Sequence, residues 1–306
     1  MAFRKAEKKK AKLRLAITGT AGSGKTYGAL LVAQGLGGRI AMIDTENGSG
    51  DLYSDICDYD ICTLSAPYRI EKYLQCIHEA EQAGYDIIII DSLSHAWAGE
   101  GGLLDLQGQI ADSQKSGNQW TSWRKITPLH NKLVEAILTS KSHIIATMRS
   151  KAEYVLVEGE RGRNEVKKVG MAPVQRDGMD YEFSVVFDLS INHAVSVSKD
   201  RTSVFDGQIF TLSPDVGLQL REWLDKGVED LTQAKQAVWQ KFLNLNNNNQ
   251  QEAMTSMKLL VGDKSSAMWT AEDIAIMNAV ADEKIASLVQ EQNQKQNSEP
   301  DSSEID

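Results

Sequence analysis

Short, nearly continuous apolar runs of strand length recur along the first two thirds of the chain. Five such runs lie at residues 13–18, 39–44, 86–91, 143–148 and 183–190. Amphipathic stretches with helical spacing separate the first four, at residues 26–36, 70–83 and 129–138. Strands that alternate with helices predict an α/β fold with a mostly parallel sheet, because a parallel pair needs a crossover connection. The continuous apolar runs also predict helices on both faces of that sheet.

The texture of the sequence changes after residue 226. Residues 231–243 and 271–289 have helical spacing, and the Asn-rich tract 246–251 between them predicts a loop. Thr270, followed by Glu272 and Asp273, is typical of a helix start. We therefore expect four parts: a basic flexible arm, an α/β core, a small C-terminal helical appendage and an acidic disordered tail, at residues 1–11, 12–226, 227–290 and 291–306.

Composition excludes several classes of protein. The 306 residues include 33 Lys and Arg against 42 Asp and Glu, a net charge of −9, which argues against a protein that coats nucleic acid by bulk charge. Local basic patches remain compatible with this balance. The apolar runs are far shorter than the ~20 residues that span a bilayer, so we expect no membrane partner. Three cysteines without a CxxC pair predict reduced, buried thiols and a cytoplasmic location.

A phosphate-binding motif follows the first predicted strand. Residues 19–26 fit G-x-x-x-x-G-K-[ST] in full, with a predicted helix directly after them. The eight residues are Gly19, Thr20, Ala21, Gly22, Ser23, Gly24, Lys25 and Thr26. Backbone N–H groups would cradle the phosphates, Lys25 would neutralise them and the Thr26 hydroxyl would bind Mg²⁺. A glycine-rich turn alone would explain the glycines but not Lys25 and Thr26 at this spacing.

Two carboxylates follow other predicted strands. Asp91 ends the run 86–91, which places it at the carboxyl edge of the sheet, where it can hold Mg²⁺ together with Thr26. Glu46 follows the run 39–44, and there it could polarise an attacking water molecule. The residues alone leave a second interpretation of Glu46 open, that of a solvated acid at a strand end.

With these motifs in order, residues 12–205 resemble the RecA/RadA-like recombinase ATPases, and most closely the short RecA-like single-strand annealing ATPases of phages. The resemblance implies a RecA-like P-loop core that binds ATP and Mg²⁺ and hydrolyses ATP. In Ile43-Asp44-Thr45-Glu46 it makes Glu46 the catalytic base, and Tyr53, seven residues later, would stack on adenine. Asp91-Ser92 matches the end of the family's magnesium-side strand.

Further positions match the family's later motifs. Thr147 stands at the polar sensor, where the bacterial recombinase has Gln, and Arg149-Ser150-Lys151 follows it. Lys199 and Arg201 match a pair of cations that, in oligomers of that family, reach the γ-phosphate bound by a neighbouring subunit. The other interpretation of this pair is an exposed strand edge. The resemblance therefore implies a homo-oligomer, a ring or a filament, and Phe3 with Ala6 matches a short peptide by which related recombinases dock into a neighbour.

Two segments are candidates for contact with single-stranded DNA. Residues 149–176 hold seven cations against four acids, a net of +3, and predict a hairpin turning at 159–164. The candidate DNA-binding residues are Arg149, Lys151, Arg161, Arg163, Lys167 and Lys168. A solvated hairpin would have a similar composition. Residues 93–122 predict a long Gly-rich loop, in which Trp97, Trp120 and Trp123 either stack on bases or belong to the core.

Two functions fit the sequence. The first is an ATPase, with DNA-stimulated hydrolysis, that acts on single-stranded DNA in phage-type homologous recombination or strand annealing. A single-strand-binding or annealing protein is then a further candidate partner. The second is a nucleotide-gated oligomeric switch that acts on a protein partner without binding DNA. A P-loop kinase of small molecules is a weaker third option, because no Arg-rich lid stands out.

Overall fold

The computed structural model describes residues 6, 8–113, 119–158, 164–228 and 231–298, and the side chains at 119–121, 153–158, 164–169, 233, 289 and 291–298 are not described. It divides into two compact units. One unit is the core, residues 11–226. The other, the helical unit, combines residues up to 10 with those from 227 onward.

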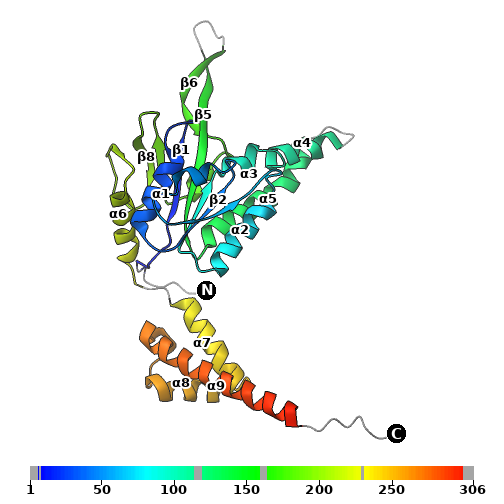
Figure 1. Ribbon diagram of the computed structural model, residues 1–306, viewed down its shortest axis with the longest axis vertical. Coiled ribbons are helices and arrows are strands. Elements are labelled where there is room, and N and C mark those ends of the chain that lie inside the picture. Colours follow the sequence, from blue (N-terminus) through cyan, green and yellow to red (C-terminus); the bar gives the residue numbers. More distant parts are fainter. Residues whose placement is uncertain (1–5, 7, 114–118, 159–163, 229–230, 299–306) are drawn as a thin grey trace. The chain divides into compact units, whose positions relative to one another are not determined.

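The described strands of the core form one sheet (Figure 1). In spatial order its main path is β3 (Asp60–Thr63), β2 (Ile40–Asp44), β4 (Ile87–Asp91), β5 (His143–Glu158), β1 (Arg14–Gly19), β7 (Val185–Leu189), β8 (Ala194–Asp200) and β9 (Phe210–Thr211). The first six are parallel, β8 and β9 are antiparallel, and β6 (Asn164–Pro173) pairs with the outer part of β5. The predicted RecA-like α/β fold with a mostly parallel sheet is confirmed.

Each face of the sheet is covered by helices. α1 (Lys25–Leu36) packs with α6 (Pro214–Asp225) on one face, and α2 (Ile70–Gln82) packs with α5 (Gln119–Thr139) on the other. Strand β4 shows why its sequence is continuously apolar. Ile88 and Ile90 belong to the cluster under α2 and α5, whereas Ile87 and Ile89 belong to the cluster under α1. Successive side chains point to opposite faces, and both faces are buried.

The predicted long loop at 93–122 is wrong. The described residues of this stretch form α3 (Ser94–Ala98), α4 (Leu103–Ser113) and the start of α5. The glycines at 99, 101 and 102 lie in the connection between α3 and α4, where Gly101 has a φ of 71°. Trp97 and Trp123 stack on each other with ring centroids 5.9 Å apart and pack against the core cluster. Both tryptophans are therefore core residues, while the side chain of Trp120 lies outside the described residues.

The helical unit consists of α7 (Thr232–Leu245), α8 (Gln250–Val261) and α9 (Ala271–Ser298) around a small apolar core that includes Phe242, Met257 and Met277. Asn249 caps α8 by accepting hydrogen bonds from the backbone of residues 251 and 252, so α8 begins inside the tract that the sequence predicts as a loop. Thr270 and Asp273 exchange backbone-to-side-chain hydrogen bonds of 2.8 and 3.2 Å at the start of α9. The predicted helix start at Thr270 is confirmed.

Three sequence-based expectations need correction. Residues 8–10 belong to no free arm, since the backbones of Lys8 and Lys10 bond to Val228 at 2.9 and 2.8 Å. Helix α9 continues to Ser298, past the boundary predicted at residue 290, because Glu, Gln and Lys have favourable helix propensities. Cys62, expected to be buried, is exposed, with its Sγ 3.2 Å from that of Cys76.

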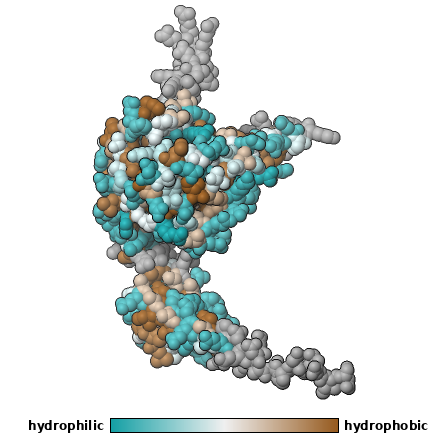
Figure 2. Space-filling view, in the orientation of Figure 1, coloured by the Kyte–Doolittle hydropathy of each residue, from teal (hydrophilic) through white to brown (hydrophobic). Residues whose placement is uncertain are grey.

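In the part of the chain that the structure describes, no helix is both long enough and apolar enough to cross a membrane. Exposed apolar side chains are scattered among polar ones over the visible faces of both units (Figure 2).

Candidate nucleotide site

The phosphate loop joins β1 to α1, as the motif requires. Gly22 and Gly24 have φ angles of 77° and 86°, in the left-handed region that favours glycine. Space is also limited at Gly24, where a Cβ would lie 3.0 Å from His193 Nδ1. The loop therefore turns tightly and begins α1 at Lys25, so that the unpaired N–H groups of the first helical turn are available to an anion.

Asp91 is the buried centre of the site. It ends β4, and its carboxylate meets one hydroxyl from the neighbouring strand β5 and one from the start of α1. Thr26 Oγ1 donates to Asp91 Oδ2 at 2.6 Å, and Thr147 Oγ1 donates to Asp91 Oδ1. Burial raises the pKa of Asp91, and the two hydroxyl donors oppose that rise. The predicted pair of Thr26 and Asp91 is thus in direct contact.

These oxygen atoms suit a hard divalent cation. Mg²⁺ prefers hydroxyl, carboxylate and phosphate oxygens and keeps several waters, so Thr26 and Asp91 could hold it beside the phosphates of a nucleotide. Lys25 Nζ donates to the carbonyl of Thr20 at 2.8 Å. Burial lowers the pKa of Lys25, and the charges of Asp91 and Glu46 oppose that change. The Lys25 ammonium and the carboxylates of Asp91 and Glu46 therefore lie close enough to influence one another's charge.

Glu46 forms an ion pair with Arg149 across the mouth of the site. Arg149 Nε donates to Glu46 Oε1 at 3.0 Å, and Arg149 Nη2 donates to Glu46 Oε2. The Glu46 backbone is fixed as well, because its N–H donates to Asp44 Oδ1 at 2.7 Å. Partial burial alone would raise the pKa of Glu46, but the hydrogen bonds and charge of Arg149 outweigh it, and this pKa lies below its ordinary value. Glu46 is therefore ionised at neutral pH.

The groups surround one cavity of about 590 Å³. Its lining includes the phosphate loop, both carboxylates and the cation of β5, namely Ala21, Gly22, Lys25, Thr26, Glu46, Ser49, Asp91, Arg149, Ser150 and Val174. A cavity of this size is adequate for a small-molecule ligand. The arrangement places two carboxylates, those of Glu46 and Asp91, and the Lys25 ammonium around the position where phosphates would bind.

A model of an AAA domain matches residues 11–255 of the sequence. The chain belongs to this AAA-domain family. Among solved structures, it is similar to an ATPase from the type III secretion system of pathogenic bacteria, at 10% identity over 88% of this chain and 81% of that chain, with a TM-score of 0.31. No curated protein matches the sequence. The family supports an AAA-type P-loop ATPase domain.

Within the AAA domain, two other predicted site residues lie apart from the phosphate loop. Lys199 lies in β8 and Arg201 directly follows this strand. Lys199 is level with Val186 of β7 and so with Ala16 of β1. The phosphate loop begins after Gly19, at the opposite end of the strand. Lys199 Nζ donates to the carbonyls of Asp180, at 3.4 Å, and of Tyr181. Their predicted action on a neighbour's phosphate stays a prediction.

The predicted adenine contact, Tyr53, ends a 3₁₀ helix (Ser49–Tyr53) after β2. Its ring meets the ring of Tyr27 edge-on, with centroids 6.0 Å apart at 70°. Tyr27 directly follows Thr26 and is 48% exposed, so it is a second aromatic candidate beside the phosphate loop. Its position next to the motif was the available signal, and sequence reasoning overlooked it.

The candidate DNA-binding residues are described only in part. Arg149 lines the nucleotide cavity, and Lys151 is exposed on β5, paired with Ala172 of β6. Lys167 and Lys168 lie in β6, but their side chains, like Arg161 and Arg163 as a whole, lie outside the described residues. Residue Phe3 of the predicted docking peptide also lies outside them.

Sequence reasoning missed a polar link behind Glu46. Thr45 Oγ1 lies 2.7 Å from His95 Nδ1 and accepts a hydrogen bond of 2.8 Å from the Ser92 backbone. The His95 ring stacks on Tyr68 with centroids 4.8 Å apart. Burial lowers the pKa of His95 and the charge of Glu46 opposes it. These residues are fifty positions apart in sequence, and no local pattern joins them. They fix the segment that carries Glu46 to the segment after Asp91.

Proposed function

We propose that the protein binds ATP with Mg²⁺, hydrolyses it, and uses the cycle to act on single-stranded DNA in homologous recombination or strand annealing of the phage type, as a homo-oligomer. The observation that carries the proposal is the path of strand β5. Thr147 of this strand bonds to Asp91, and Arg149, two residues later on the same strand, bonds to Glu46. The strand then runs on into the hairpin whose sequence is rich in cations.

In the proposed reaction, the phosphate loop and Lys25 bind the β- and γ-phosphates. Thr26 and Asp91 would hold Mg²⁺, which neutralises charge on the phosphate oxygens. A water molecule attacks the γ-phosphorus, the bond to the β–γ bridging oxygen breaks, and Glu46 accepts the proton of the water. The products are ADP and phosphate. Lys199 and Arg201 of a neighbouring copy would contribute positive charge to the same phosphate.

The hairpin supplies a route by which a bound strand can alter hydrolysis. β5 and β6 extend beyond the carboxyl ends of the neighbouring strands (Figure 1), and β1 pairs with β5 only as far as Arg149. DNA phosphates that attract the cations of this segment would pull on the strand that carries Arg149. Displacing Arg149 would change the orientation of Glu46 and raise its pKa, since this side chain lowers it. The proposal therefore includes DNA-stimulated hydrolysis.

The first test is fluorescence anisotropy of a labelled single-stranded oligonucleotide over a salt series, with and without Mg²⁺-ATP. We expect binding that ATP strengthens and salt weakens. Reversing the charges of Arg161, Arg163, Lys167 and Lys168 should weaken binding by about tenfold or more and flatten the salt dependence, because phosphate contacts are lost. The matched control reverses four exposed cations outside the hairpin, Lys125, Lys132, Lys141 and Lys226.

The outcomes separate the two candidate functions. Equal losses in the hairpin variant and the control would show only an effect of net charge and would contradict a DNA site on the hairpin. No binding in any nucleotide state at low salt, together with measurable phosphate release from ATP, would favour the nucleotide-gated switch that acts on a protein partner.

A further inference from the structure

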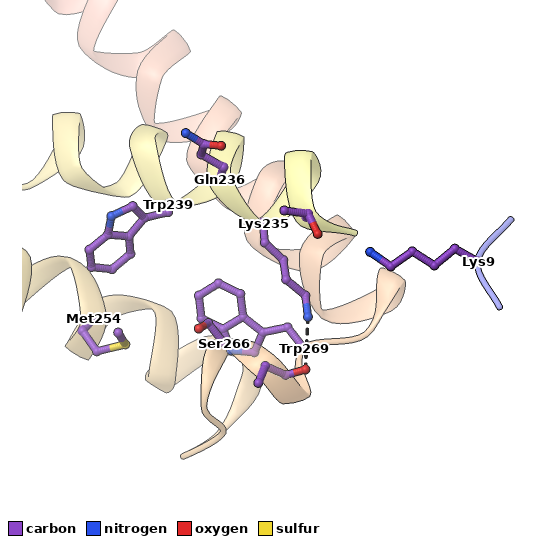
Figure 3. A pocket seen from close by; sticks show the side chains of 9 residues that line it. Lys9, Lys235, Gln236, Trp239, Met254, Ser266 and Trp269 are labelled. Atoms are coloured by element: carbon purple, nitrogen blue, oxygen red, sulfur yellow. Dashed lines mark hydrogen bonds between the residues drawn. The ribbon is translucent and has the colours of Figure 1, made fainter. Parts of the chain in front are cut away.

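The helical unit contains a pocket of about 800 Å³, remote in sequence from the phosphate motif. It is lined by Lys9, Thr232, Lys235, Gln236, Trp239, Met254, Ser266, Ala267 and Trp269. Figure 3 shows two lysines at one end and Trp239 with Met254 at the other, with Trp269 between them. The pocket thus combines positive charge with an apolar, aromatic floor.

One detail of the lining points to an acidic ligand. In the described part of the chain, the three ion-paired lysines of this unit, Lys241, Lys258 and Lys264, have Asp partners. Lys235 forms no ion pair there and donates to the Ala267 carbonyl at 3.2 Å. A carboxylate would complement this cation, because opposite charges attract across a binding surface.

We propose that this pocket binds residues 299–306 of a second copy of the chain. The segment reads Glu-Pro-Asp-Ser-Ser-Glu-Ile-Asp, with four acids and no cation. Ile305 stands between Glu304 and Asp306, so one apolar side chain enters the aromatic part of the pocket while its neighbours meet the lysines. The segment thus offers negative charge and one apolar side chain to a pocket that offers positive charge and an apolar floor.

The segment must come from another copy because of distance. Trp269 precedes α9 by two residues, and α9 is 28 residues long, or about 40 Å at 1.5 Å per residue. Residues 299–306 follow the far end of that helix, and eight residues span at most about 29 Å when extended. The segment of the same chain therefore cannot reach the end of the pocket at Trp269 while α9 is intact. Because each copy has both parts, the contact can repeat from copy to copy.

This inference goes beyond the proposed function and does not rest on DNA binding. The first experiment is anisotropy of a fluorescent peptide, residues 299–306 with blocked ends, titrated with the full chain. We expect saturable binding that salt weakens. Lys235→Glu should weaken it about tenfold, because attraction becomes repulsion. Lys258→Glu, an equal charge change on α8 outside the pocket, should leave it unchanged. An Ile305→Ser peptide should also bind more weakly.

Two results would overturn the proposal at this stage. The first is no saturable binding to either the full chain or a chain that ends at residue 298, whose pockets have no competing segment. The second is equal binding of a scrambled peptide, which would assign the pocket to acidic peptides in general rather than to this segment.

Mixing two variants tests the contact between copies. A Lys235→Glu chain keeps the segment but lacks the pocket cation, and a chain ending at 298 keeps the pocket but lacks the segment. By sedimentation velocity, we expect each variant alone to associate less than the wild-type chain and the mixture to form a complex of the two. A mixture that sediments as the sum of its separate components would show that no contact forms between copies and would overturn the proposal.

Discussion

Hydrogen-bonded polar groups gather at both ends of the central strands, and the two ends differ in the partners of those groups. At the carboxyl end, Asp91 and Glu46 bond to hydroxyls and to a guanidinium, all of them on side chains. At the amino end, Arg14 donates to the backbone carbonyls of Leu13 and Ser142, both at 2.8 Å, and of Leu138 and Ser140. His143 beside it accepts the Leu13 N–H at 2.9 Å.

This difference separates a site from a structural cluster. Side-chain partners can rotate away when a nucleotide or a cation arrives, whereas backbone carbonyls are fixed by the strands and helices that contain them. Burial lowers the pKa of Arg14 to about 10 and that of His143 to about 4, so one remains charged and the other neutral at pH 7. Substitutions at the carboxyl end should therefore impair activity, and substitutions at the amino end should impair stability.

The largest expected effect is at Lys25. Lys25→Ala removes the ammonium that the phosphates would meet, and its only described hydrogen bond goes to one loop carbonyl. We expect no measurable ATP binding by isothermal titration calorimetry and an unchanged melting temperature. Lys132→Ala, on the exposed side of α5, is the control and should bind normally. Retained binding by Lys25→Ala would remove the phosphate loop from the proposed site.

Next in size is the effect of removing the proposed base, Glu46. Glu46→Gln keeps the shape of the side chain but cannot accept a proton, so phosphate release should fall roughly a thousandfold, within the range of general base catalysis. ATP affinity should stay close to that of the wild-type chain. Exposed Glu135→Gln on α5 should have full activity. Normal turnover by the Glu46 variant would assign the base to another residue.

At the amino end of the strands, a substitution should lower stability and leave ATP binding unchanged. Arg14 is 5% exposed, and Arg14→Met leaves carbonyls on several segments without a donor. We expect a loss of about 3 kcal/mol in the free energy of unfolding, measured with urea, because unsatisfied buried groups keep their desolvation cost. ATP affinity of the folded variant should not change. Arg39→Met makes the same change at an exposed arginine of the same end and should cost under about 1 kcal/mol. Similar losses in both variants would contradict the structural role of Arg14.

The same contrast explains what could be predicted from sequence. The phosphate loop, the sheet class and Asp91 depend on local spacing, and the apolar run 87–90 identifies a strand buried on both faces. The pairs Glu46–Arg149 and Asp91–Thr147 lie 103 and 56 positions apart. These contacts depend on the register between strands, which no single segment encodes. The individual residues could therefore be predicted from the sequence, but their contacts could not.

Two features of the fold were not predicted from the sequence. Residues 93–122 looked like a loop because their glycines are conspicuous, yet those at 99, 101 and 102 only connect α3 to α4. Helix α4 has one fully buried residue, Leu103, so few positions mark an apolar face in its sequence. The run 13–18 placed Arg14 in the first strand but did not predict its burial, because its guanidinium is enclosed by backbone carbonyls that distant residues contribute. A buried cation and a solvated one have the same sequence signal.

The smallest expected effect concerns His143 and pH. Its pKa is lowered to about 4 by burial and by the positive charges of Lys12 and Arg14, while Asp225 and Asp86 oppose the shift. In the unfolded chain the ordinary value is about 6.5. Well above pH 6.5, His143 is neutral in both the folded and the unfolded chain. As pH falls from 6.5 toward 4, only the unfolded state gains the proton, so stability is lost, by about 2 kcal/mol at pH 5.

Urea unfolding at pH 7.5 and pH 5 measures this loss, and a matched variant isolates it from other titrating groups. His143→Asn retains an acceptor for the Leu13 N–H but cannot be protonated, so its stability should depend less on pH, by about 2 kcal/mol over that interval. Exposed His78→Asn on α2 should keep the pH dependence of the wild-type chain. Equal pH dependence in the wild-type chain and the His143 variant would mean that the amino-end cluster tolerates a second charge beside Arg14. The distinction between a cluster held by fixed backbone partners and one with exchangeable partners would then fail at this residue.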